Sequence, residues 1–186
     1  MASLNIAIIV GSTRPGRYGA AVAAWVYEQA SGRADARYEV IDLERTKLPL
    51  LDESVPALLG QYEHQHTRDW AATVARFDGF VFVTPEYNHS TSPALLNALD
   101  YVYGEWNNKA AAFVSYGTSY GVRAVEHLRG VVGELQMADI RNQVRLQLPG
   151  NFPDRVFTPS PEHHQQAADL FDQLERWAGA LRAVRS

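Results

Sequence analysis

Five short apolar runs, each followed by a segment with helical periodicity, constrain the fold of this 186-residue chain more than any other feature. The runs predict strands at residues 5–10, 38–43, 80–83, 110–116 and within 139–148. The run at 80–83 is continuously apolar, which is typical of a strand covered on both faces. Strands that alternate with helices form a parallel sheet with right-handed crossovers and helices on both faces. We therefore predict an α/β fold, a three-layer sandwich around a five-stranded parallel sheet.

Helix start and stop signals lie between these strands. Gly32 is placed to end the first helix, which begins after residue 19. Thr67, Ser92 followed by Pro93, and Ser160 followed by Pro161 are predicted to begin three later helices. Residues 44–60 are predicted to be irregular. The predicted core faces of the five helices are Val22, Trp25, Val26 and Ala30; Trp70, Ala71, Val74 and Phe77; Leu95, Leu96, Leu99, Val102 and Tyr103; Val122, Val125, Val132 and Leu135; and Ala167, Leu170, Phe171, Leu174, Trp177, Ala178 and Leu181.

The length of the chain predicts one domain, residues 1–186, which would bury about 70% of its unfolded surface in a single core. In this size class we expect strand order 2-1-3-4-5, the flavodoxin-like order. A ligand would then bind at the carboxyl ends of strands one and three, where the order reverses.

Composition excludes several classes of function. The formal net charge is −4 and the basic residues do not cluster, which argues against nucleic-acid binding. Apolar stretches fall short of the ~18 residues that a membrane span needs, and the first residues do not resemble a signal peptide. Zero cysteines exclude disulfides, thiolate chemistry and iron–sulfur clusters. We expect a soluble, cytoplasmic protein.

Residues 11–19 (GSTRPGRYG), here called loop 1, join the first apolar run to the first helix. The start of a helix offers unpaired N–H groups and the positive end of its dipole, and hydroxyl and guanidinium groups favour a doubly charged phosphate. Turn geometry alone also collects Gly, Ser and Pro in such loops. A nucleoside triphosphate loop would need Lys-Ser or Lys-Thr after Gly16, and a dinucleotide fingerprint would need glycine at Thr13. Loop 1 therefore favours a terminal monophosphate such as that of FMN.

Two further loops follow strands three and four. Loop 2, residues 84–91 (TPEYNHST), can present backbone groups toward the rim of a flat heterocycle, although a plain turn is the alternative. Loop 3, residues 117–121 (GTSYG), has glycines that permit close approach, and Tyr116 or Tyr120 could stack on a ring. All three loops are expected to meet at one edge of the sheet.

Histidines suggest no metal site. His64 and His66, and His163 and His164, lack a partner set at metal spacing, so solvated segments are the better interpretation. His89, in loop 2, is expected near the ligand. A Ser-His-Asp arrangement cannot be inferred from sequence, since a triad is recognised by its geometry.

Several sequence blocks in this order resemble the NADPH-dependent FMN reductase family. They are Gly11 to Arg14, Pro85 to Asn88, residues 97–101 (NALDY), Ser115 to Gly117 and residues 121–125 (GVRAV), within a resemblance over about residues 4–140. This family includes FMN, quinone, azo-dye and chromate reductases on a flavodoxin-like fold.

The resemblance implies an FMN site. Ser12 and Arg14, with Gly11 and the backbone around Arg17, Tyr18 and Gly19, would bind the FMN phosphate. Pro85, Glu86, Tyr87 and Asn88 would wrap the isoalloxazine edge, and Ser115, Tyr116 and Gly117 would line its other side. Family members often have Ser at Arg17, which would make this pocket more cationic, and Gly at Thr118 and Tyr120.

The implied activity is an FMN-dependent NAD(P)H oxidoreductase that passes hydride from NADPH or NADH to a small-molecule acceptor. That acceptor would be a quinone, an azo compound, a metal ion or free flavin handed to a flavin-dependent monooxygenase. The chemistry belongs to the flavin, so no side chain is assigned as catalytic acid or base. A non-enzymatic electron carrier is the main alternative, and a phosphotransferase is disfavoured by the missing Lys-Ser/Thr pair. A homodimer or homotetramer is also expected, with residues 101–106 as a candidate interface or as ordinary core.

Overall fold

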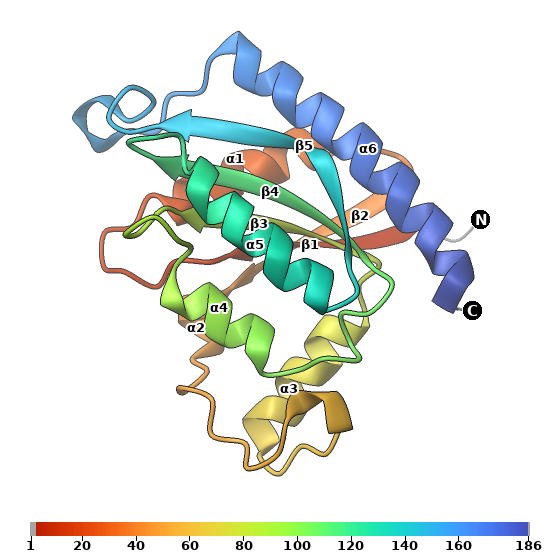
Figure 1. Cartoon of the computed structure of the whole chain (residues 1–186). Coiled ribbons are helices and arrows are strands. Elements are labelled where there is room, and N and C mark those ends of the chain that lie inside the picture. The colour runs from red at the N-terminus through yellow and green to blue at the C-terminus, as the bar shows by residue number, and fades with distance from the viewer. Residues whose placement is uncertain (1–2, 186) are drawn as a thin grey trace.

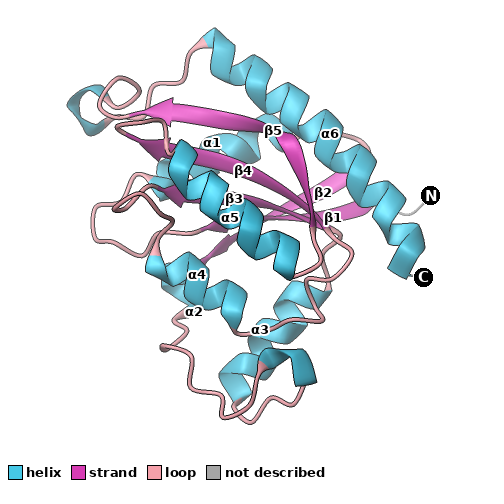
Figure 2. Cartoon of the chain, viewed as in Figure 1, coloured by secondary structure: helices cyan, strands magenta, loops and turns pink. Residues whose placement is uncertain are grey.

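The central layer is a five-stranded, all-parallel sheet of order β2-β1-β3-β4-β5 (Figures 1 and 2). A computed structural model describes residues 3–185. The strands are β1 (Leu4–Val10), β2 (Ala36–Asp42), β3 (Gly79–Pro85), β4 (Ala110–Gly117) and β5 (Ala138–Gln147). The flavodoxin-like fold and its strand order, predicted from the sequence, are confirmed.

Helices cover both faces of the sheet. The helices are α1 (Gly19–Ala30), α2 (Leu43–Thr46), α3 (Gln65–Ala75), α4 (Pro93–Asp100), α5 (Val122–Glu134) and α6 (Pro161–Arg185), with 3₁₀ turns η1 (Ala57–Leu59) and η2 (Pro153–Arg155). Buried side chains of α1 and α6 pack with one face of the sheet, and those of α3, α4 and α5 pack with the other. The predicted three-layer sandwich is therefore correct.

The core is deepest around β3 and β4, in which every residue is buried. Phe80, Phe82 and Phe113 of these strands stack side by side, and the Trp106 ring lies edge-on to Phe80 with centroids 4.8 Å apart. Each fully buried aromatic side chain contributes about 2–3 kcal/mol of hydrophobic free energy. The carboxyl ends of β1, β3 and β4 are thus held by the best-packed part of the molecule.

One helix-boundary prediction needs correction. Thr67 does not begin α3, because His64 is the N-cap and Thr67 is the buried third residue of the helix. The Glu53 carboxylate accepts the N–H groups of Glu63 and His64 at 2.7 and 3.1 Å, so a distant carboxylate holds the backbone just before the helix. Ser92, by contrast, caps α4 as predicted, since its hydroxyl accepts the Leu95 N–H.

Burial also corrects the sequence analysis at several positions. Residues 44–60 are not wholly irregular, because the Asp42 carboxylate caps the short helix α2 and η1 follows. Trp177, expected in the core, is 39% exposed. Tyr101, Val102 and Trp106 are fully buried, so they belong to the core and not to an interface. None of the helices found between residues 3 and 185 has the length and apolarity to cross a membrane.

Candidate functional site

Loops 1, 2 and 3 lie side by side because their strands are neighbours in the sheet. The register pairs Val10 with Val83, and Pro85 with Tyr116. The Gly11 N–H donates to the Val83 carbonyl at 2.9 Å, and the Glu86 N–H donates to the Tyr116 carbonyl at 3.0 Å. The backbone of each loop is therefore held to the next.

Gly11 and Ser12, the first residues of loop 1, pack closely against β3, α4 and loop 2. A Cβ on Gly11 would lie 2.9 Å from the Val83 carbonyl oxygen and 3.0 Å from Leu95 Cδ2, so only glycine fits. Ser92, the cap of α4, also donates its hydroxyl to the Gly11 carbonyl. Ser12 is fully buried, and its hydroxyl lies 2.9 Å from the Tyr87 hydroxyl of loop 2. Loop 1 and loop 2 thus share a polar contact at the base of the site.

The start of α1 is left uncapped by the chain itself. Tyr18 occupies the N-cap position, and its side chain makes no capping hydrogen bond. The first helical hydrogen bond runs from the Val22 N–H to the Tyr18 carbonyl at 3.1 Å. The N–H groups of the helical residues before Val22 therefore have no acceptor within the helix. These groups and the helix dipole favour an anion at this position.

Two buried polar atoms beside this helix start have no hydrogen-bond partner among the described residues. They are the Tyr116 hydroxyl and Arg17 Nε. Burial raises the pKa of Tyr116 above its usual value, so the hydroxyl stays protonated and can donate. A Cβ on Gly19 would lie 2.9 Å from this hydroxyl oxygen, so glycine is needed for the approach. An anion at the start of α1 would satisfy both donors.

Arg17 itself is paired with carboxylates. Its Nη2 lies 2.5 Å from Asp42 Oδ2 and 3.8 Å from Glu44 Oε2. Because these carboxylates offset its charge, the expectation that Arg17 makes the pocket more cationic is not supported. Its Nε, on the same edge of the guanidinium as Nη2, remains without a hydrogen-bond partner among the described residues.

A cavity of about 290 Å³ lies at this position. Arg14 and Arg155 carry no ion pair among residues 3–185, so they supply the unpaired positive charge around the cavity. Sequence reasoning missed Arg155, which comes from η2 after β5 and lies in a stretch with no recognisable motif. The cavity is lined by Arg14, Pro15, Gly16, Arg17, Tyr18, Pro85, Glu86, Tyr87, Tyr116, Leu148 and Arg155.

Loop 2 folds as a tight hairpin. Tyr87 and Ser90 exchange backbone hydrogen bonds of 2.8 and 3.0 Å, and Asn88 and His89 occupy the turn with φ values of 49° and 67°. Left-handed conformations at two successive residues are typical of a two-residue hairpin turn. The hairpin borders a wide, open cavity of about 750 Å³. That cavity is lined by Arg14, Glu86, Tyr87, Asn88, Ser90, Thr91, Pro93 and Leu96.

Polar contacts from α5 hold loop 2 in place. The Glu86 carboxylate accepts from Arg123 Nη1 at 2.7 Å and from the Arg123 N–H at 3.3 Å, and its side chain is only 8% exposed. His127 Nδ1 lies 3.1 Å from the Ser90 hydroxyl. Glu86, expected at the ligand edge, lines both cavities while its charge is matched by Arg123.

Loop 3 differs from the expectation. Ser115 is fully buried and its hydroxyl donates to the Tyr120 carbonyl at 2.7 Å, so it is used inside the loop. A Cβ on Gly117 would lie 3.1 Å from Glu86 Cβ, so this glycine lets loop 3 pack against loop 2. The Tyr116 ring is buried beside Phe152 at 6.1 Å, so it offers its hydroxyl and not a stacking face. Of Ser115, Tyr116 and Gly117, only Tyr116 lines either the 290 Å³ or the 750 Å³ cavity.

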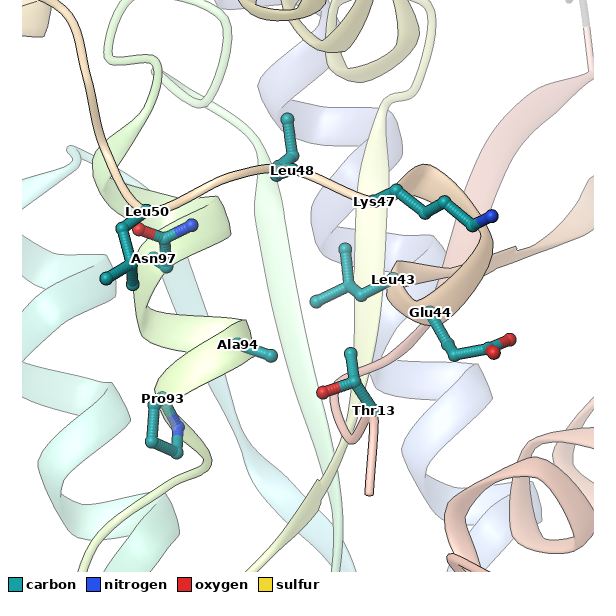
Figure 3. Close-up of a pocket in the computed structure, with 9 residues that line it drawn as sticks. All are labelled: Thr13, Leu43, Glu44, Lys47, Leu48, Leu50, Pro93, Ala94 and Asn97. Carbon is teal, nitrogen blue, oxygen red and sulfur yellow. The ribbon is translucent and has the colours of Figure 1, made fainter. Parts of the chain in front are cut away.

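A separate cavity of about 390 Å³ lies beyond Thr13, between α2 and α4 (Figure 3). Leu43, Leu48 and Leu50 line it together with Pro93 and Ala94, and Glu44 and Lys47 lie at one side (Figure 3). The Asn97 amide accepts from the Leu51 N–H at 2.9 Å and donates to the Pro49 carbonyl at 2.7 Å. The polar atoms of Asn97 therefore hold the 49–51 backbone, and none of the side chains that line this cavity is a buried polar group without a partner among the described residues.

The histidines form no metal site in the described part of the chain, where no cluster of three His, Asp or Glu side chains has suitable geometry. His64 and His66 stack with ring centroids 5.2 Å apart, and His66 bonds the Asp52 carboxylate at 2.9 Å. His163 bonds Ser160 at the start of α6. His163 is buried, so the prediction of a solvated segment is wrong for this residue.

Comparison with known proteins identifies the family. The sequence profile described as NADPH-dependent FMN reductase matches residues 4–148. The chain belongs to this family. It is 38% identical over 169 residues to an NAD(P)H-dependent FMN reductase of Schizosaccharomyces pombe, covering 89% of this chain and 84% of the relative. It is 34% identical over 181 residues to an NAD(P)H-dependent FMN reductase of Saccharomyces cerevisiae, covering 90% and 94%.

Solved structures show the same fold. A flavoenzyme NAD(P)H:acceptor oxidoreductase from Paracoccus denitrificans superimposes with a TM-score of 0.74 at 20% identity, covering 95% of this chain and 98% of that one. An NADH:FMN oxidoreductase gives a TM-score of 0.71 at 20% identity, covering 93% and 89%. Membership of the family makes the chain an FMN-dependent NAD(P)H oxidoreductase, as its sequence motifs indicated.

Proposed function

We propose that FMN binds across loops 1 and 2, with its phosphate in the 290 Å³ cavity at the start of α1. The observation that carries this placement is the pair of buried donors without partners, Tyr116 Oη and Arg17 Nε. Leaving such a group unpaired costs about 1–3 kcal/mol, which a phosphate oxygen would recover. Ser12, Arg14 and the N–H groups from Tyr18 to Gly19 would complete the contacts, and Gly11 permits the loop to approach β3.

Pro85, Glu86, Tyr87 and Asn88 would hold the ring of the flavin. Loop 2 is rigid at both ends of its hairpin, and its edge borders the open 750 Å³ cavity next to Arg14. We revise the role of Ser115 and Gly117 to shaping loop 3, since neither lines a cavity.

Bound FMN would supply the two-electron chemistry, by accepting hydride from NADPH or NADH and passing it to a second substrate. The chain would contribute position and electrostatics, because Arg123 fixes the Glu86 carboxylate at the edge of the site. No side chain is assigned as an acid or base.

The acceptor would be a small molecule that enters the open cavity, such as a quinone, an azo compound, a metal ion or free flavin. Quinones are the first choice, because relatives at 31% identity include a 2-hydroxy-1,4-benzoquinone reductase of Burkholderia and a quinone reductase of Pseudomonas putida. Release of reduced flavin to a flavin-dependent monooxygenase is the alternative use of the same site.

We also propose that the protein is cytoplasmic and forms a homodimer or homotetramer. Leucines between α2 and α3, together with one on α4, are unusually exposed for apolar side chains near the site and could be covered by a second copy. Their exposed fractions are 81% for Leu50, 48% for Leu51, 66% for Leu58, 57% for Leu59 and 37% for Leu96.

The test is a flavin absorbance spectrum of the purified protein, followed by NADPH and NADH turnover with a panel of quinones. An enzyme should consume NADPH when a quinone such as menadione is supplied. A non-enzymatic carrier would bind FMN without consuming NADPH by itself. Absence of flavin absorbance together with FMN affinity weaker than micromolar would refute the placement of FMN.

A further inference from the structure

The segment from Pro149 to Thr158, here called the strap, leaves the end of β5 and packs against loop 1. Figure 1 shows it as the light-blue loop beyond the arrowhead of β5. Phe152 is 3% exposed, and its ring lies 4.5 Å from Tyr18, the N-cap of α1. Phe157 packs edge-on against Trp25 with centroids 5.6 Å apart. Two aromatic anchors therefore hold the strap on the start of α1.

Hydrogen bonds within the strap define its shape. The Asn151 side chain accepts the Gln147 N–H at 2.7 Å, and the Thr158 N–H donates to the Asn151 carbonyl at 2.8 Å, which closes the segment on itself. Asp154 and Arg155 have φ values of 48° and 65°, a left-handed conformation that costs free energy for residues with a side chain. Such strain is common in ligand clamps, where it fixes the direction of one side chain.

Arg155 is the side chain that this conformation directs to loop 1. Its Nη2 donates to the Gly16 carbonyl at 3.2 Å, and its guanidinium carbon lies 5.8 Å from the centroid of the Tyr18 ring. No carboxylate pairs with Arg155 within residues 3–185. It lines the same 290 Å³ cavity as Tyr116, whose buried hydroxyl has no partner among the described residues.

The charges around the cavity argue for a ligand at Arg155. Arg17 is already matched by Asp42, whereas Arg14 and Arg155 both point unpaired charge at one small cavity. Like charges close together are unfavourable unless an anion lies between them. A doubly charged phosphate with three terminal oxygens could meet a donor from loop 1, a donor from the sheet and a donor from the strap.

We propose that Arg155 is a third cationic contact to the FMN phosphate, and that the strap clamps the phosphate against the start of α1. This inference rests on the proposed placement of FMN. The contact lies outside the part of the chain that matches the family profile, which ends at residue 148. The strap would slow FMN release, because Arg155 must move before the phosphate can leave.

The test compares FMN with riboflavin, which has the same ring and ribityl chain without the phosphate. Fluorescence titration and stopped-flow dissociation are measured for the full chain, for Arg155→Ala and for Arg155→Lys. Arg37→Ala is the matched control, because Arg37 is also exposed but lies at the amino end of β2, away from the loops. Circular dichroism checks that each variant is folded.

Arg155→Ala should weaken FMN about 10-fold and speed its dissociation, while riboflavin affinity stays within twofold. Arg155→Lys should fall between, because lysine keeps the charge and loses the guanidinium fork. Arg37→Ala should leave both ligands unchanged. The loss for FMN should shrink as salt is raised.

Equal losses for FMN and riboflavin would overturn the inference, since they would mean that Arg155 only shapes loop 1. Unchanged FMN affinity in Arg155→Ala would also overturn it. If the unmodified protein binds neither flavin, the proposed placement of FMN fails first, and this result is distinct from either of the other two.

Discussion

Replacing Tyr116 with Phe should change stability and FMN affinity in opposite directions. The Tyr116 hydroxyl is buried without a partner, and such a group costs about 1–3 kcal/mol. Tyr116→Phe removes only that oxygen, so the protein without FMN should gain about 1–2 kcal/mol. For a chain of this size each kcal/mol raises the melting temperature by roughly 2–4 °C.

The same substitution should weaken FMN. A hydrogen bond to a charged group contributes about 1.5–3 kcal/mol, which corresponds to a loss of roughly 10- to 100-fold in affinity. Because burial raises the pKa of Tyr116, the hydroxyl donates across the neutral pH range, and the loss should not depend on pH there. Thermal unfolding with and without FMN, combined with fluorescence titration, measures both effects on one sample.

Tyr101→Phe is the matched control. The Tyr101 hydroxyl can donate its one proton to the Asp52 carboxylate at 3.0 Å or to the Pro49 or Leu50 carbonyl, each at 3.2 Å. Losing this hydrogen bond should destabilise the protein by about 1 kcal/mol and leave FMN affinity unchanged. If Tyr116→Phe lowers the melting temperature without FMN, or binds FMN as well as the unmodified protein, the reasoning about the unpaired hydroxyl is wrong.

Three further predictions concern packing at the site and a buried carboxylate at the other end of the sheet. Gly19→Ala would place a Cβ 2.9 Å from the Tyr116 hydroxyl and should lower the free energy of unfolding in urea by about 1–3 kcal/mol. Adding Tyr116→Phe should restore part of this loss. If the effects of the two substitutions on the free energy of unfolding simply add, the clash is contradicted. Ser92→Ala should lower the free energy of unfolding by about 1 kcal/mol through loss of the α4 cap. It should also weaken FMN binding, because the Ser92 hydroxyl holds the Gly11 carbonyl. An unchanged urea midpoint would refute the first effect. Burial alone would raise the pKa of Asp78, but hydrogen bonds from Arg182 and the Asn5 N–H and the charges of Arg182 and Arg185 hold it below its usual value. The stabilisation by Asp78 should therefore be present at neutral pH and lost as pH falls below about 4. Asp78→Asn should lower the free energy of unfolding by on the order of 2–3 kcal/mol at pH 7, and this free energy should then change less as the solution is acidified. If the free energy of unfolding falls with pH in parallel for the two proteins, this role of Asp78 is excluded.

Much of the site could be predicted because it depends on local signals. The apolar run before Gly11 and the alanine-rich segment after Gly19 specify a strand, a turn and a helix without help from the rest of the chain. Ser92 followed by Pro93 specifies a helix start in the same way. The alternation of strands and helices then implies a parallel sheet, and a parallel sheet brings the carboxyl ends of its strands to one edge.

Other predictions failed where contacts distant in the chain decide the outcome. Thr67 has the chemistry of a cap, but Glu53 reaches the helix start and His64 becomes the N-cap. For residues 101–106 the sequence left a subunit interface and ordinary core both open, and Tyr101 and Trp106 lie in the core. Hydrophobic pattern cannot tell an interface from a core, because both bury the same side chains.

By itself, the sequence of this protein determined the fold class, the strand order, the three loops at one sheet edge and the family. Only the tertiary structure decided which donors in those loops are free. Arg17 forms an ion pair with Asp42, and the Ser115 hydroxyl donates to the Tyr120 carbonyl. The Tyr116 hydroxyl is buried without a partner among the described residues. It also brought Arg155 to Gly16, a residue 139 positions earlier in the chain. Periodicity and turn chemistry act over a few residues, whereas the pairing of buried polar groups depends on strand register and packing, which no short stretch of sequence encodes.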